Sequence, residues 1–176
     1  MLKLVTTAAA GVLFAGSVFA GAEKVSFPEG YQTHFVRYAT VDNAKRKKAR
    51  FFYVNPESLA KAEPGQPVPS GTVLVMEDRG VKLGADGTPL IDSRGRFIPT
   101  SEILNVFVQE KQPGWGAEYD SKKRNGEWEY AWFDPAGKLR RGAKVNYDGC
   151  FACHKERAEA NDYNFTFSPF IKRIKQ

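Results

Sequence analysis

Two cysteines and a histidine near the end of the chain have the spacing of a haem-attachment site. Two residues separate Cys150 from Cys153, and His154 follows directly. In a Cys-x-x-Cys-His motif the two thiols bond covalently to the porphyrin edge, and the histidine coordinates the iron from the proximal side. The sequence therefore predicts one covalently attached haem c per chain, held by Cys150 and Cys153, with His154 as the proximal iron ligand.

Other uses of a close cysteine pair fit the sequence less well. Such a pair can form a disulfide in an exported protein, and it also occurs in thiol oxidoreductases. The oxidoreductase pair follows a strand near the beginning of a βαβ unit, whereas this pair lies near the C-terminus. A structural zinc site needs four ligands, and the only other histidine is the remote His34. Haem is the preferred interpretation.

The group on the far side of the iron decides between electron transfer and ligand chemistry. The candidates are His34, Met76, a lysine, or no protein group at all, because Met76 is the only methionine after Met1. Methionine is most often a filler of gaps in apolar cores, so packing remains an alternative role for Met76.

Runs of β-branched and aromatic residues predict the strands that would carry such a ligand. Four strands are expected, over residues 50–54, 72–77, 102–110 and 127–133. Alternation places Met76 on one face of the second strand, and Asn105 and Phe107 on one face of the third. The opposite faces are mostly valine and leucine. We expect the face with methionine, asparagine and phenylalanine to line the haem, and the valine- and leucine-rich face to form a core.

Turn and capping signals complete the expected architecture. Asn55 and Pro56 should begin a helix that ends near Ala62, and residues 79–99 read as an excursion with tight turns. Asn-Gly at residues 125–126 indicates a hairpin. The haem motif should start a short helix, and residues 165–174 are expected to form a last strand. The predicted fold class is α+β, mostly β: an antiparallel sheet with a few short helices.

The beginning of the chain has the features of a secretory signal. Lys3 precedes an uncharged, apolar stretch, and small residues follow it. We expect cleavage after Ala20, with cleavage after Ala22 as the second choice, and hence export to the periplasm. An uncleaved anchor is the alternative, although the stretch is short for a membrane span. Residues 21–176 then form a single domain, without a membrane span after cleavage.

The net charge of the chain indicates which kinds of partner it could bind. Lysine and arginine number 26 against 20 aspartates and glutamates, giving a net charge of +6. Export argues against a nucleic-acid partner. Clustered positive charge would instead suit an acidic redox partner, because surface charge steers encounters.

Three motifs in this order resemble the cytochrome P-460 family and its sister branch, cytochrome c-prime-beta. They are Phe-Phe-Tyr-Val-Asn-Pro-Glu-Ser at residues 51–58, Gly-Thr-Val-Leu-Val-Met-Glu at 71–77, and Cys-Phe-Ala-Cys-His-Lys at 150–155, followed by Phe-Thr-Phe at 165–167. The resemblance covers the chain from about residue 31 to its end. It implies a mostly β, periplasmic, monohaem protein that forms a homodimer and uses His154 as proximal ligand.

Two departures from the family pattern change the expected activity. The family's hydroxylamine-oxidising enzymes carry a lysine cross-linked to the porphyrin, and motif matching puts Met76 at that position. Their distal carboxylate aligns with Asn105; the nearest acid, Glu110, falls on the opposite strand face. A thioether cannot form the amine cross-link, and an amide cannot act as a general base. Cytochrome c-prime-beta also lacks the lysine and has a phenylalanine-lined distal pocket, for which Phe52 and Phe107 are candidates here.

We therefore predict a His154/Met76-ligated cytochrome that transfers single electrons to a periplasmic redox partner and binds NO or CO if Met76 is displaced. Three alternatives stay open: a five-coordinate gas-binding cytochrome, a hydroxylamine-oxidising enzyme in which a lysine such as Lys82 substitutes for the missing one, and a passive binding protein whose redox change is incidental. Arg50 and Trp132 are further candidates for the haem edge.

Overall fold

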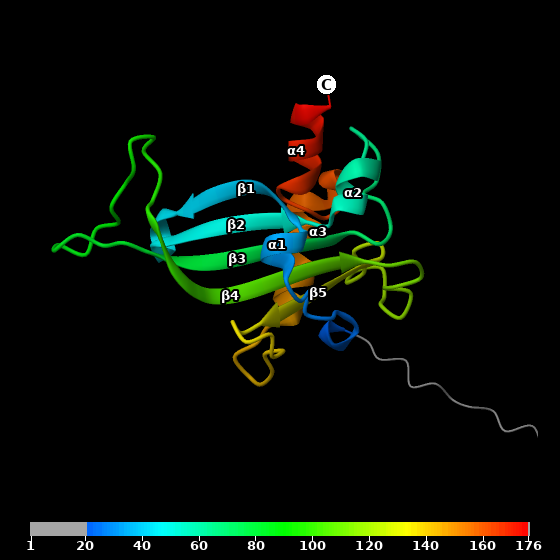
Figure 1. Ribbon diagram of the computed structural model, residues 1–176. Coiled ribbons are helices and arrows are strands. Elements are labelled where there is room, and N and C mark those ends of the chain that lie inside the picture. The colour runs from blue at the N-terminus through cyan, green and yellow to red at the C-terminus, as the bar shows by residue number, and fades with distance from the viewer. Residues whose placement is uncertain (1–20, 176) are drawn as a thin grey trace, which may run out of the picture.

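A five-stranded antiparallel sheet forms the centre of the molecule (Figure 1). The computed structural model describes residues 21–175, so the predicted signal peptide lies outside the described residues. Every strand pairs with its sequence neighbours, in the order β1-β2-β3-β4-β5. The strands are β1 (Val36–Asn43), β2 (Lys48–Val54), β3 (Val73–Val81), β4 (Pro99–Lys111) and β5 (Trp128–Phe133). The α+β, mostly β fold class is confirmed.

Short helices cover both faces of this sheet. In Figure 1, α1 lies in front of the sheet, α3 lies behind it, and α4 rises above the edge formed by β1. The α-helices are α1 (Tyr31–His34), α2 (Pro56–Lys61), α3 (Tyr147–Ala158) and α4 (Phe167–Ile174). Three 3-10 turns accompany them: η1 (Ala22–Lys24), η2 (Ala44–Arg46) and η3 (Glu159–Asn161).

The two sheet faces bury two separate apolar clusters. Val75 and Val108 pair across β3 and β4 and lie in the first cluster, which the N-terminal segment and α1 cover. Trp128, Phe151 and Phe167 lie in the second cluster, which α3 and α4 cover. The strand alternation expected from the sequence is therefore present, and the valine-rich face is a core.

A buried carboxylate on β3 interrupts the valine-rich face. Glu77 is fully buried there, and its carboxylate accepts hydrogen bonds from the Tyr31 hydroxyl and from Gln32 Nε2, the latter at 2.7 Å. Arg79 forms an ion pair with the same carboxylate. Burying a charge is costly unless it is paired and hydrogen-bonded, and these three partners meet that requirement.

Three local expectations need correction. Residues 167–174 form the helix α4 rather than a strand, because the apolar Phe167, Phe170, Ile171 and Ile174 have helical spacing, which outweighs the alternation of residues 165–167. Asn125 does not turn a hairpin. It is fully buried in the long connection between β4 and β5, where its side chain bonds to other segments.

The third correction concerns the start of α2. Asn55 occupies the N-cap position as expected, but its side chain does not cap the helix. Its Oδ1 accepts a hydrogen bond from Val73 N at 2.9 Å, and its Nδ2 donates to Gly71 O at 3.2 Å. Asn55 thus joins the start of α2 to the start of β3, the strand that carries Met76.

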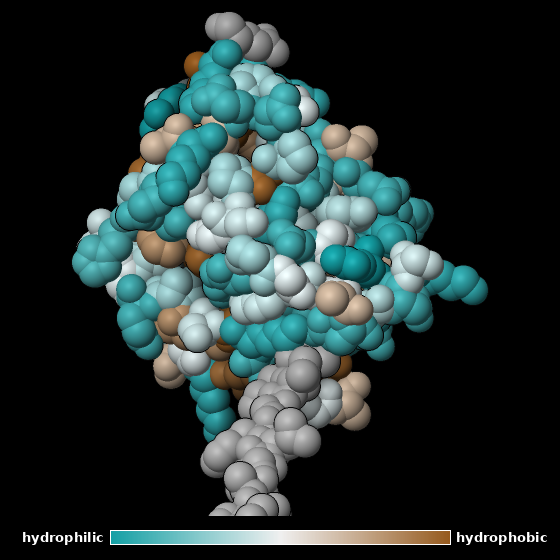
Figure 2. Space-filling model, turned by 90° about the vertical axis from the view of Figure 1, so that its right-hand side faces the viewer, coloured by the Kyte–Doolittle hydropathy of each residue, from teal (hydrophilic) through white to brown (hydrophobic). Residues whose placement is uncertain are grey.

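The surface shown in Figure 2 is mostly hydrophilic, with apolar residues scattered over it. Within residues 21–175, no helix combines the length and apolar character that crossing a bilayer requires.

Candidate haem site

Helix α3 presents the attachment motif on one side. Cys150, Cys153 and His154 are spaced i, i+3 and i+4, which places their side chains on the same helix face. Asn146 caps the helix, because its Oδ1 accepts a hydrogen bond from Gly149 N at 2.8 Å. Both cysteines are free thiols, and burial raises the pKa of Cys150.

A buried aromatic anchor holds α3 against β5. Phe151, between the two cysteines, packs edge-on against Tyr130 and Tyr119, with ring centroids 4.8 and 5.0 Å away. Asn125 Nδ2 donates to Phe151 O at 2.9 Å and to the Tyr130 hydroxyl at 3.0 Å. The peptide that carries the cysteines is therefore fixed to the sheet by packing and by a buried hydrogen bond.

The imidazole of His154 is oriented for metal binding through Nε2. Its Nδ1 lies 2.6 Å from the carbonyl oxygen of Tyr163. A carbonyl oxygen only accepts, so Nδ1 carries the proton and Nε2 keeps its lone pair. Tyr130 and Phe165 pack against the ring, with centroids 4.6 and 4.7 Å away. Burial lowers the pKa of His154, which favours the neutral form that coordinates iron.

The carbonyl that accepts this proton belongs to an unusual turn. Asp162 and Tyr163 are consecutive residues with φ of 51° and 57°, in the left-handed region that non-glycine residues rarely adopt. The buried side chain of Asn164 bonds to Asn161 O and to Ser168 on either side of it. We call residues 161–164 the proximal turn.

Strand β4 ties the proximal turn to the sheet. Lys111 Nζ forms an ion pair with Asp162 Oδ2 at 2.8 Å, and the same oxygen accepts from Val68 N at 2.8 Å. Gln109 Nε2 donates to Tyr163 O at 2.8 Å, so Gln109 and His154 share one acceptor. These contacts hold the turn in a conformation that would otherwise be strained.

A cavity of about 410 Å³ lies between this helix and the sheet, a volume within the range of small-molecule sites. Seven of the nine site residues predicted from the sequence line it: Arg50, Phe52, Met76, Phe107, Cys150, Cys153 and His154. The structure therefore brings the attachment motif and the proposed distal residues into one cavity.

The sheet wall of the cavity is a row of residues paired across neighbouring strands. Phe52 pairs with Met76, and Met76 pairs with Phe107. Directly paired residues point to the same side of a sheet, so the thioether of Met76 lies between two phenylalanines. Met76 is partly exposed to the cavity rather than fully buried, in contrast to the core residue Val75 beside it.

The other two predicted residues lie beside Phe107 on the same face of the sheet, Trp132 at the side of the row away from Met76 and Asn105 two residues before Phe107 on β4. Trp132 pairs with Phe107 and stacks on it, with centroids 5.3 Å apart and an interplanar angle of 22°. The Trp132 Nε1–H donates to Asn105 Oδ1 at 2.9 Å. Neither Trp132 nor Asn105 is among the residues that line the cavity.

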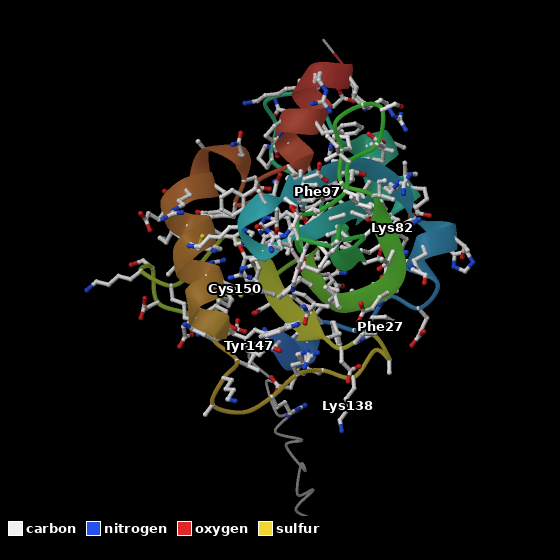
Figure 3. The ribbon with its side chains drawn as sticks, turned by 90° about the vertical axis from the view of Figure 1, so that its left-hand side faces the viewer. Phe27, Lys82, Phe97, Lys138, Tyr147 and Cys150 are labelled. Atoms are coloured by element: carbon white, nitrogen blue, oxygen red, sulfur yellow. The ribbon has the colours of Figure 1, made fainter. Side chains whose placement is uncertain are left out.

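Two further candidates for the iron lie elsewhere. His34 ends α1 on the opposite side of the sheet, and Lys82 is exposed at the start of the excursion between β3 and β4. Figure 3 shows Lys82 well away from Cys150. Glu110 pairs with Val73 and does not line the cavity.

The structure adds residues that the sequence reasoning missed. Asp78 is buried on the Met76 face, paired with Asn105, and its carboxylate bonds to Arg50 Nε at 2.9 Å and Lys48 Nζ at 3.2 Å. Strand alternation puts Asp78, two residues after Met76, on the same strand face, so the sequence pattern could have identified Asp78. Further cavity-lining residues are Tyr38, Arg46, Leu74, Gln109, Tyr130, Asn164 and Phe165. Those that come from segments distant in sequence from Met76 and from the attachment motif had no local sequence signal.

The residues present fit a covalently bound haem. Two free thiols and an imidazole with its Nε2 lone pair available face one cavity, and that cavity has aromatic walls and two arginines among its lining residues. Arginine is well suited to bind carboxylates such as the haem propionates.

Comparison with known proteins gives one family. No curated protein matches the chain. The model of the family described as Cytochrome P460 matches residues 28–166, which include the whole sheet and the attachment motif. This range covers more than half of the chain, and it includes both the strand that carries Met76 and the helix that carries His154. The chain belongs to the cytochrome P460 family, and it is a haem cytochrome.

Proposed function

We propose that this protein is a c-type monohaem cytochrome that transfers single electrons, with His154 and Met76 as the axial iron ligands. The observation that carries the proposal is the position of Met76, at the centre of the Phe52–Met76–Phe107 row on a cavity that His154 also lines. Besides His154 and the two attachment cysteines, Met76 supplies the only sulfur or imidazole group among the lining residues.

The residues around the cavity have distinct roles in this proposal. A bound haem supplies one-electron redox chemistry. Cys150 and Cys153 would anchor it, His154 would bind its iron through Nε2, and a thioether from Met76 would raise the reduction potential relative to a second imidazole. Arg50, which pairs with Asp78 at 2.9 Å and lines the cavity, would neutralise a propionate in this proposal.

The apolar phenylalanines beside Met76 favour a second activity. Phe52 and Phe107 flank the thioether and offer NO or CO a site with few competing polar groups if Met76 is displaced. A five-coordinate gas-binding cytochrome is the corresponding alternative. The hydroxylamine-oxidising alternative has less support, because no lysine is among the cavity-lining residues and Lys82 is exposed outside them.

The proposal includes export to the periplasm, assembly as a homodimer and an acidic redox partner. Within the described residues, Ala22 is buried in the core, and Glu23 pairs with Arg141 at 3.0 Å. Cleavage after Ala22 would remove a core residue. The burial of Ala22 supports cleavage after Ala20, with Gly21 as the first residue of the mature protein.

The Met76→Ala variant tests the ligation. Removing the thioether should convert the ferric iron from low-spin to high-spin and lower the reduction potential. Leu74→Ala is the matched control, because Leu74 lies on the same face of β3 and also lines the cavity. The control should leave the spin state unchanged. If Met76→Ala behaves like Leu74→Ala, Met76 is packing and the proposal fails.

A further inference from the structure

An aromatic stack leads from the haem cavity to the surface. Phe107 lines the cavity, and Trp132 stacks on Phe107 on the side away from Met76. The guanidinium of Arg140 lies over the Trp132 ring, 5.2 Å from its centroid. The three side chains form one continuous series, with Phe107 on the cavity and Arg140 in the loop that follows β5.

Hydrogen bonds fix this series in place. The Trp132 indole donates to Asn105 at 2.9 Å, and Arg140 N donates to Trp132 O at 2.8 Å. The hydroxyl of Tyr147, the first residue of α3, donates to Arg140 O at 2.8 Å. The helix that carries the haem cysteines therefore also holds the outer end of the stack.

The outer end lies in a strongly basic loop. We call residues 138–144 the basic loop; it contains Lys138, Arg140, Arg141 and Lys144. Lys138, Arg141 and Lys144 are exposed. Arg141 pairs with Glu23 but keeps 67% of its side chain exposed, and within residues 21–175 no carboxylate lies within 4.0 Å of Lys138 or Lys144. In Figure 3, Tyr147 lies between Cys150 and this loop, and Lys138 points outward from it.

We propose that the basic loop is the docking surface for an acidic redox protein and that Phe107 and Trp132 couple the haem to it. This inference rests on the proposed one-electron function. One electron passes from the reduced haem to the acceptor, whose centre is reduced by one electron; no proton moves and no bond changes. The stacked rings of Phe107 and Trp132 are in contact, and a gap between them would weaken the electronic coupling. The exposed cations of the basic loop steer a negatively charged partner.

Two small oxidants of opposite charge test the docking surface. The reduced holoprotein is mixed in a stopped-flow instrument with anionic ferricyanide or with cationic tris(phenanthroline)cobalt(III), at low and high salt. Replacing Lys138, Arg141 and Lys144 by glutamine should slow oxidation by ferricyanide by about threefold or more at low salt, because steering rates respond strongly to local charge. Oxidation by the cobalt complex should not slow, and the difference should vanish at high salt.

A charge-matched control separates local docking from net charge. Replacing Lys61, Lys82 and Lys172 by glutamine removes the same charge from exposed positions outside the basic loop. This control should slow ferricyanide less than the basic-loop variant does. Equal slowing by the two triple variants would overturn the docking surface.

The coupling role of Trp132 needs its own variants. Trp132→Leu should slow oxidation by ferricyanide severalfold with an unchanged ferric spectrum and potential, and Trp132→Phe, which keeps a stacked ring, should restore most of the rate. Unchanged rates in Trp132→Leu would overturn the coupling role. A high-spin wild-type spectrum combined with slowed rates would reject Met76 as ligand while leaving the electron route intact, so the two proposals fail separately.

Discussion

At the scale of single residues, the proximal hydrogen bond is set by two donors that share the Tyr163 carbonyl oxygen. His154 Nδ1 lies 2.6 Å from this oxygen and Gln109 Nε2 lies 2.8 Å from it. A carbonyl already engaged by an amide attracts the imidazole proton less strongly. In the proposed ligation, Gln109 would therefore limit the electron density that His154 donates to the iron.

Replacing Gln109 by leucine should lower the reduction potential. Without the amide donor, the Tyr163 carbonyl accepts more strongly from His154, the imidazole gains anionic character, and the ferric state is stabilised. Spectroelectrochemical titration measures the potential. Gln112→Leu, just after the end of the same strand, removes an amide that donates to Glu110 instead and should leave the potential unchanged. An unchanged or raised potential in Gln109→Leu would contradict this role.

The residues of the site differed in how far the sequence could reveal them. Cys150, Cys153 and His154 followed from a motif, and Met76 followed from scarcity, since the chain has one other histidine and one other methionine. Phe107 and Asn105 shared a predicted strand face, yet only pairing to β5 shows that Asn105 bonds to Trp132 beside Phe107. Strand register is a long-range property that local alternation does not fix.

At the scale of elements, α3 depends on the connection between β4 and β5. Asn125 is fully buried there, and its amide reaches Phe151 O inside the attachment motif and the Tyr130 hydroxyl on β5. The Asn-Gly dipeptide suggested a turn because its local conformational preference is strong. The buried amide instead serves a tertiary contact, and no local pattern announces that contact.

The Asn125→Ala variant should lower the free energy of unfolding by roughly 1–3 kcal/mol, because it leaves buried acceptors without their donor. The loss should be concentrated at α3, with faster amide hydrogen exchange over residues 147–153. Lys122→Ala, exposed in the same connection, serves as the control. If amide hydrogen exchange became faster evenly over the sheet but stayed unchanged in α3, Asn125 would not be the anchor of the haem helix.

The strands were predictable because their β-branched and aromatic content agrees with their burial, and β2 to β5 lie where they were expected. The C-terminal segment was assigned wrongly because Phe165 and Phe167 alternate locally, whereas the helical spacing of residues 167–174 becomes decisive only over two turns. The proximal turn could not be predicted, since its left-handed residues are neither glycine nor asparagine and depend on Asn164, Lys111 and Gln109.

At the scale of the whole molecule, the sheet separates a haem face from a second core that contains buried acids. Glu129 is fully buried, accepts from the Tyr119 hydroxyl at 3.1 Å, and has one carboxylate oxygen without a hydrogen bond among the described residues. Burial raises the pKa of Glu129 above its ordinary value. Ionisation of this side chain therefore costs the folded state stability.

The sign of the pH dependence follows from that shift. At low pH Glu129 is protonated in both states, and as the pH rises the unfolded chain ionises first, so the folded state loses stability until the pH passes the raised pKa. Glu129→Gln should therefore raise Tm at about pH 7.5, with the gain shrinking toward about pH 4, near the ordinary glutamate pKa. Thermal unfolding of the holoprotein measures this, with the exposed Glu156→Gln as control. A gain independent of pH would contradict the assignment to ionisation.

The most direct test of the central claim is the visible and near-infrared spectrum of the purified ferric protein. Ligation by His154 and Met76 predicts low-spin bands together with the weak sulfur-to-iron charge-transfer band. A high-spin ferric spectrum without that band would contradict the claim and favour the five-coordinate gas-binding alternative, and a shifted, broadened Soret band after reduction would favour the cross-linked enzyme.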